Sequence, residues 1–175
     1  MASHRKPVIV RKFSRDWCAG YAAASLGFVA AEEGSAELEI LDPDGKVLRI
    51  DWGQVKWVCY VRDFPAGETT NPERLFRKRF ATRPRAAGLW MRLTLADGEV
   101  LEGLAANDRS LIEGAGLLLT PPDTRSNTQK VYVPRQAIQT LEVVSRIGAI
   151  RPRRNSSADR ANEQPNLFPV EPDTG

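Results

Sequence analysis

The residues with the clearest chemical character form a basic run in the middle of the chain. Positions 74 to 85 contain no acidic residue, and Phe76 and Phe80 lie among the cations. Guanidinium and ammonium groups at this density neutralise phosphates, and aromatic rings between them can stack on bases. This pattern predicts a polyanion-binding strip for RNA or DNA, made of Arg74, Arg77, Lys78, Arg79, Arg83 and Arg85.

The same segment also has a purely structural interpretation. Phe76 and Phe80 are four residues apart, a spacing that places two side chains on one face of a helix. Asn71 is a favourable N-cap, Pro72 suits the first helical position, and Pro84 disfavours helix in the residue before it. We therefore favour a solvated linker helix, which its two phenylalanines anchor on a neighbouring domain.

The chain offers little for catalysis. His4 is its one histidine, and no serine or cysteine has a recognisable base partner. Cys18 and Cys59 lie in apolar patterns, without the CxxC spacing of a redox or metal site. We predict that the protein is not an enzyme and that it uses no metal and no cofactor.

The C-terminal segment, residues 146–175, is polar and rich in proline, a composition typical of disorder. Within it, the pentapeptide QPNLF is similar to the QxxLF peptides by which bacterial proteins dock on the DNA sliding clamp. The resemblance implies that Leu167 and Phe168 fill an apolar pocket while the amide of Gln164 fixes the register. The sliding clamp is thus a candidate protein partner.

The elements that carry these motifs recur along the chain. Adding 83 to the positions of Gly20 and Val58 gives Gly103 and Leu141, and the turn at 43–44 has a counterpart 79 residues later. The first copy contains the strand-like segments VIVRKF, WCAGYA, AELEIL, KVLRI and VKWVCYV. The second contains LWMRLTL, EVLEGLA, GLLLT, KVYV and QTLEVV. Both sets are rich in β-branched and aromatic residues, which favour strands.

Glycines and turn residues predict how these strands are connected. Gly20 and Gly103 fall inside strand patterns, where a missing side chain permits the bend that curls a short sheet into a barrel. Asp97-Gly98 and the segment 42–45 predict tight turns. We predict an all-β protein of two five-stranded barrels. Its divisions are a first barrel at 1–61, a basic connector at 62–88, a second barrel at 89–145 and a disordered tail at 146–175.

The segments LTLADGEVLEGLAAND, residues 93–108, and VYVPRQAIQTLEV, residues 131–143, resemble the two signature segments of the Sm-like family. This resemblance implies small Sm/SH3-like barrels in tandem. Two RNA-contacting positions depart from the family pattern. Ile112 stands where the family usually has asparagine, and Pro134-Arg135 stands where it has Arg-Gly. The family's usual nucleotide pocket is therefore not expected here.

Two further resemblances bear on function. YVRDF at 60–64 and LLLTPPDTRSNTQKVYVPRQAI at 117–138 resemble an uncharacterised bacterial family. Arg79 and Arg83, followed by Asp108-Arg-Ser110, are similar to the RxxxR and DxSxxG signature of PilZ barrels, although the closing glycine comes one place late at Gly114. This similarity implies a sensor of a cyclic dinucleotide.

Charge and hydropathy complete the sequence-based expectation. The connector has seven basic and three acidic residues, a net charge of +4, whereas the two predicted barrels carry 0 and −2. No leader or membrane-spanning run is visible, so we predict a cytoplasmic protein with no membrane partner.

We predict a non-catalytic adaptor that holds protein partners through its tail and through the edges of the fourth and fifth strand of each barrel. These edges can pair with each other or with another molecule, which includes self-association. RNA or DNA binding by the connector, and cyclic-dinucleotide sensing, are the alternatives.

Overall fold

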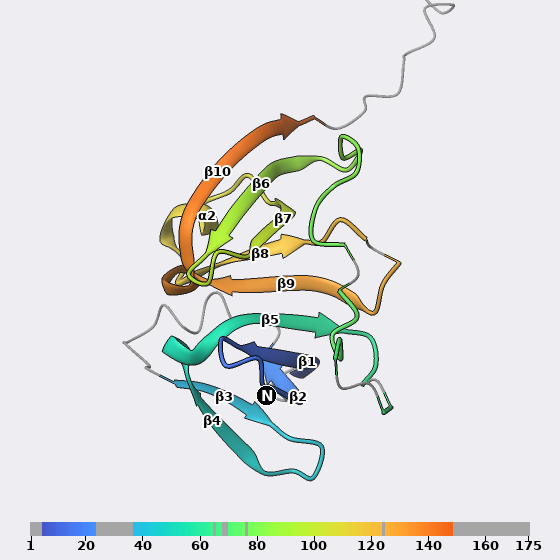
Figure 1. The fold of residues 1–175 in the computed structure, drawn as a ribbon, viewed down its shortest axis with the longest axis vertical. Coiled ribbons are helices and arrows are strands. Elements are labelled where there is room, and N and C mark those ends of the chain that lie inside the picture. The colour runs from blue at the N-terminus through green and yellow to red at the C-terminus, as the bar shows by residue number, and fades with distance from the viewer. Residues whose placement is uncertain are drawn as a thin grey trace, which may run out of the picture.

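A computed structural model of the chain describes residues 5–23, 37–64, 66–67, 70–75, 77–123 and 125–148. Within these residues, ten strands form one antiparallel sheet in the order β10-β6-β7-β8-β9-β5-β1-β2-β3-β4 (Figure 1). The prediction of an all-β protein is confirmed.

The first repeat consists of β1 (Arg5–Lys12), β2 (Trp17–Ala23), β3 (Glu37–Leu41), β4 (Val47–Asp51), the 3-10 turn η1 (Trp52–Gln54) and β5 (Val55–Val61). The second repeat consists of β6 (Gly88–Leu95), β7 (Val100–Ala105), the short helix α2 (Ser110–Glu113), β8 (Gly116–Thr120), β9 (Thr128–Pro134), the 3-10 turn η2 (Arg135–Ala137) and β10 (Ile138–Ile147). In each repeat the strands follow the same spatial order, which is fifth, first, second, third, fourth.

The predicted offsets recur in the structure. β1 and β6 are related by 83 residues at both ends, as are η1 and η2, and β3 and β8 are related by 79. Gly20 and Gly103 occupy equivalent positions where two strands approach closely. A Cβ at Gly20 would lie 2.6 Å from the carbonyl oxygen of Leu41, and one at Gly103 would lie 2.7 Å from Cβ of Leu119. Both glycines are therefore required for the strands on either side to pair.

The two separate five-stranded barrels that the sequence predicts are not shown, because the described strands form one open sheet. Each strand has two edges, and β5 uses both of them, one for β1 and the other for β9. No edge of β5 remains to close the first repeat against β4. Among the described strands, β4 pairs only with β3 and β10 only with β6, so these two form the outer edges of the sheet. The predicted pairing between the edges of the two copies is confirmed, by β5 and β9.

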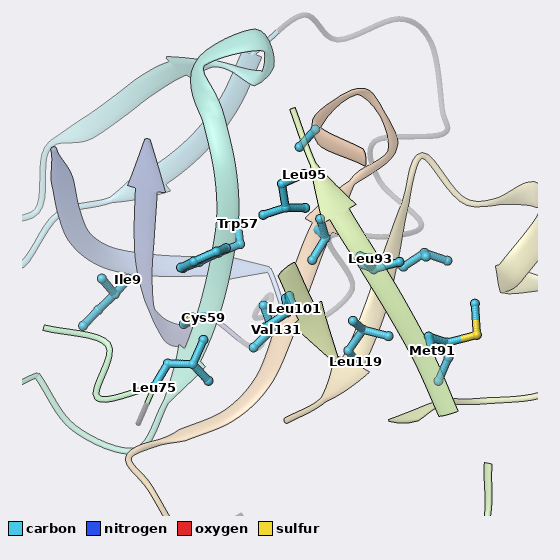
Figure 2. Packing of buried hydrophobic residues seen from close by; sticks show 14 of the residues in the cluster. Ile9, Trp57, Cys59, Leu75, Met91, Leu93, Leu95, Leu101, Leu119 and Val131 are labelled. Carbon is cyan, nitrogen blue, oxygen red and sulfur yellow. The ribbon is translucent and has the colours of Figure 1, made fainter. Parts of the chain in front are cut away.

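The two repeats also share their interior. One buried cluster contains Ile9, Trp57 and Cys59 from the first repeat together with Leu93 and Leu119 from the second, as Figure 2 shows. A smaller cluster fills the first repeat and includes Tyr132 from β9. Two interactions thus hold the repeats together, namely the β5–β9 ladder and the buried apolar side chains of the shared cluster.

The expected connector helix is absent from the described residues between β5 and β6. A turn does begin at Asn71, whose carbonyl accepts from the amide of Arg74 at 3.0 Å and whose Oδ1 accepts from the amide of Leu75 at 3.2 Å. It ends at once, because Arg74 has a left-handed φ of 48°. Leu75 then enters the shared core, and the connector continues in turns and bends.

Candidate functional site

The six basic side chains of the predicted strip are all exposed, and they differ in their partners. Arg74, at the start of the strip, is not without a partner. Lys78 pairs with Glu99 and lies over the ring of Trp57, with Nζ 5.6 Å from the ring centroid. Four others have no side-chain ion pair or hydrogen bond with any residue that the structure describes, namely Arg77, Arg79, Arg83 and Arg85. These four guanidinium groups are available to a ligand.

Three of these arginines line a groove of about 330 Å³. The connector forms one wall, with Phe80, Pro84 and the arginines. The other wall comes from the ends of β7 and β8 and contributes Leu104, Thr120, Pro121 and Pro122. Among the residues that the structure describes, no acidic side chain lines this groove, so the charged side chains of its described lining are all positive.

A buried carboxylate fixes the aromatic side of this region. Glu102 on β7, 3% exposed at its side chain, accepts from the amide of Phe80 at 3.0 Å, from Trp90 Nε1 at 3.1 Å and from Arg92 Nε at 2.9 Å. Burial opposes its ionisation, but these hydrogen bonds outweigh burial and hold the pKa of Glu102 below its ordinary value. The rings of Phe80 and Trp90 meet edge to face at 5.6 Å.

A second cavity, of about 950 Å³, lies where the two repeats meet the connector. Lys56 is the extra residue of a β-bulge, since Trp57 pairs with Arg11 and Val55 with Lys12. Its buried ammonium reaches across to Asp97 and Glu99 in the β6–β7 turn, and Glu99 also binds Lys78.

The pKa of both carboxyls is affected by this arrangement. Burial would raise the pKa of Asp97 and of Glu99, but other interactions outweigh it and lower both. For Asp97 these are the bond and charge of Lys56 and backbone amide bonds, and for Glu99 they are the bonds and charges of Lys56 and Lys78. The cavity also contains a paired Arg11 and Glu73, whose closest N–O distance is 2.6 Å. Its charges are therefore largely satisfied from within, unlike those of the groove.

The outer edge of β10 is a third surface of interest. Leu141 and Val143 are 44% and 53% exposed, although they lie opposite Leu93 and Met91, which are buried. Directly opposed residues in a ladder place their side chains on the same face of the sheet. Leu141 and Val143 therefore lie on the face of the sheet that covers the core, but nothing in the described residues buries them fully.

The residues of the PilZ-like signature do not form one site in the structure. Arg83 lines the groove and Arg79 does not. Asp108 instead accepts at 2.9 Å from the amide of Ser110, the first residue of α2, and neither Asp108 nor Ser110 lines the groove. Ile112, at the position where Sm-like proteins usually have asparagine, is exposed on α2.

The tail residues Gln164, Leu167 and Phe168 lie outside the described residues, as does Phe76, so the clamp-docking prediction stays a prediction. Within the described parts of the chain there is no group of three metal-ligating side chains. No described helix has the length and apolar character needed to cross a membrane.

Sequence reasoning missed three features of these sites. Glu102 interrupts the apolar strand VLEGLA, and a carboxylate inside such a run could have indicated a buried anchor. Lys56 interrupts VKWVCYV in the same way. No sequence signal indicates that Leu141 is exposed. Its counterpart in the first repeat, Val58, is also apolar and yet is fully buried.

Comparison with known proteins gives one match. No curated protein and no solved structure matched the chain. The model of a family of unknown function, DUF6982, matches residues 4–145, which is most of the chain. The predicted resemblance to an uncharacterised family is thereby confirmed, while the Sm-like, PilZ and clamp-binding resemblances stay predictions. The chain belongs to DUF6982, a family of unknown function.

Proposed function

We propose that this chain is a non-catalytic binding protein whose β10 edge takes up an extended strand from a protein partner. A difference between the repeats supports the proposal. In the first repeat, the outer edge of the fifth strand is paired with β9, with Val58 opposite Tyr132 and Val61 opposite Thr128. In the second repeat, the corresponding edge of β10 has no neighbouring strand among the described residues.

Exposure at equivalent positions is the observation that carries the proposal. Val58 and Tyr60 on β5 are 0% and 6% exposed, whereas Leu141 and Val143, which follow them by 83 residues, are 44% and 53% exposed. Full burial of a side chain of this size contributes about 1.5–3 kcal/mol. An added strand that covered the exposed half of Leu141 and Val143 would gain roughly half of that for each.

The chemistry of the partner follows from the strand that fills the first edge. β9, with the sequence TQKVYVP, combines β-branched and aromatic residues with polar ones. A partner segment of the same kind would bond to the main chain of β10 and place apolar side chains over Leu141 and Val143. One short strand offers modest affinity, and we expect Kd between about 1 μM and 1 mM, which corresponds to roughly 4–8 kcal/mol.

The test is a titration of the full chain with a labelled peptide of the β9 sequence, residues 126–136, followed by fluorescence anisotropy. We expect saturable binding that is lost in the variant Leu141→Lys/Val143→Glu, because charges on the inner side of an edge block strand addition. Val47→Lys is the matched control, since Val47 is 56% exposed on β4, the opposite edge of the sheet.

The control variant should bind as the original chain does, and circular dichroism of both variants should show an intact sheet. Absence of saturable binding, or equal binding by the Leu141→Lys/Val143→Glu variant, would show that β10 is not the acceptor. Loss of binding in Val47→Lys alone would assign the acceptor edge to β4 and would equally contradict the proposal.

A further inference from the structure

We propose that the arginine-lined groove between the connector and the ends of β7 and β8 is a binding site for single-stranded nucleic acid. The site is separate from the β10 edge. The inference depends on three observations, namely unpaired positive charge, an aromatic ring held in place, and a hollow of limited size.

The charge of the groove is unbalanced. Arg77, Arg83 and Arg85 line it, and the described part of the chain places no carboxylate among them. Two exposed arginines elsewhere on this protein do bind acids. Arg49 binds Glu39 at 3.0 Å and Arg109 binds Glu113 at 2.7 Å. A groove in which exposed guanidinium groups are left without acids suits an anionic ligand, and the planar fork of arginine matches phosphate oxygens.

Positive charge also continues beyond the groove. Lys130 on β9 donates through Nζ to Oγ1 of Thr120 at 2.6 Å, and Thr120 lines the groove. Arg79 is exposed on the connector between Arg77 and Phe80. A chain of phosphates that extended beyond the groove would therefore find further cations nearby, as a polynucleotide requires and a single phosphate group does not.

The aromatic component is pre-organised. Phe80 is half-buried and lines the groove, its amide is bonded to Glu102, and its ring contacts the ring of Trp90. A ring fixed in this way loses little conformational freedom when a base stacks on it. Pro84, Pro121 and Pro122 form rigid apolar walls around it.

The size of the groove favours a single strand. A volume of about 330 Å³ is near the lower limit of pockets that hold small ligands, so it accommodates one unpaired base and its sugar. A duplex keeps its bases stacked inside and would offer only phosphates to these residues. Stacking on Phe80 therefore requires an unpaired nucleotide.

The test is the anisotropy of fluorescein-labelled 12-mers of deoxythymidine and of uridine, titrated with the full chain at two salt concentrations. We expect saturable binding at low salt that weakens as salt rises, with log K falling by about 0.7 per phosphate contact for each tenfold rise in salt. Arg83→Glu/Arg85→Glu should reduce the affinity at least tenfold and should flatten this salt dependence.

Matched variants separate local from general effects. Arg5→Glu/Lys46→Glu makes the same change in net charge at exposed positions that do not line the groove, and should change the affinity less than threefold. Phe80→Leu keeps an apolar side chain beside Trp90 but removes the aromatic ring. It should weaken binding about tenfold and leave the salt dependence unchanged. Leu141→Lys/Val143→Glu should bind the oligonucleotides as the original chain does.

Three results would overturn the proposal. The first is no saturable binding at about 50 mM salt, where phosphate contacts are strong. The second is an equal loss of affinity in Arg5→Glu/Lys46→Glu and in Arg83→Glu/Arg85→Glu. The third is a preference for another phosphate ligand, either a duplex that competes as well as the single strand or a cyclic dinucleotide that displaces it at stoichiometric concentration.

Discussion

Tyr132 of β9 lies directly opposite Val58 of β5, and through this pair a strand of the second repeat completes the core of the first. Tyr132 is 1% exposed, and its ring meets Trp52 of η1 edge to face at 5.8 Å. Burial, reinforced by Tyr60, raises the pKa of Tyr132 to about 12. Tyr132, at the β5–β9 junction, is thus as fully buried as side chains in the interior of either repeat.

Gly116→Ala is expected to destabilise the protein, because Tyr132 leaves no room for a side chain at Gly116 on the neighbouring strand β8. A Cβ there would lie 2.4 Å from Cζ of Tyr132. Overpacking of this kind costs about 1–3 kcal/mol. Urea denaturation should show the loss, and Gly148→Ala, where no atom lies within 4 Å, should be close to neutral. Equal stability of the two variants would contradict the packing at Tyr132.

Lys56→Met should also lower the free energy of unfolding. The substitution leaves Asp97 and Glu99 beside each other without their shared cation. Removing one partner of a fully buried pair costs about 3–5 kcal/mol, and because both carboxylates here are partly exposed we expect about 1–2 kcal/mol. Lys46→Met, at an exposed turn, is the control and should change stability by less than about 0.5 kcal/mol.

Acid should destabilise the protein over a pH range that is set by the pKa values of three carboxyl groups. The folded-state pKa values of Asp97, Glu99 and Glu102 are lowered, so the folded state releases their protons more readily than the unfolded state does. Their stabilisation is complete above the ordinary values of 3.8 and 4.5, and it is lost as pH falls through the lowered values.

Denaturation at pH 6, 4 and 3 measures this loss. Glu99→Gln should be less stable than the original chain at pH 6 and should lose less stability than the original chain between pH 6 and pH 3. If Glu99→Gln lost as much stability with acid as the original chain, the assignment of this pH dependence to the Lys56 cluster would be wrong.

The two cysteines should differ in reactivity. Burial raises the pKa of Cys59 well above its ordinary value, and the thiol lies in the shared core, whereas Cys18 is only partly buried. Alkylation by iodoacetamide at pH 8, followed by mass spectrometry, should modify Cys18 first and Cys59 only on unfolding. Modification of Cys59 at the rate of Cys18 would show that the core opens locally.

Some of this structure could be predicted from sequence for clear physical reasons. The strands follow from alternating β-branched and aromatic residues, and the 83-residue offset holds because equivalent strands, turns and the glycines at 20 and 103 meet the same packing demands. The turn at Asp97-Gly98 is local, and Gly98 has the expected positive φ of 80°.

The remaining features depend on contacts between residues far apart in sequence. The first repeat does not close into a barrel, because β9 pairs with the free edge of β5. No local sequence pattern indicates which strand will pair with a given edge. The connector helix does not form in the described residues, because the backbone turns left-handed at Arg74, and Leu75 packs in a core made by both repeats. The groove could be anticipated only as a basic run, since Thr120 and the prolines opposite the arginines are more than thirty residues away.

The central claim is that β10 has an unfilled edge equivalent to the filled edge of β5. Amide hydrogen exchange, followed by NMR with and without the β9-sequence peptide, tests it most directly. We predict that amides of β10 facing away from β6 exchange much faster than their counterparts on β5 in the free protein and become protected when the peptide is added. Full protection of β10 in the free monomer, or no change with saturating peptide, would contradict the claim.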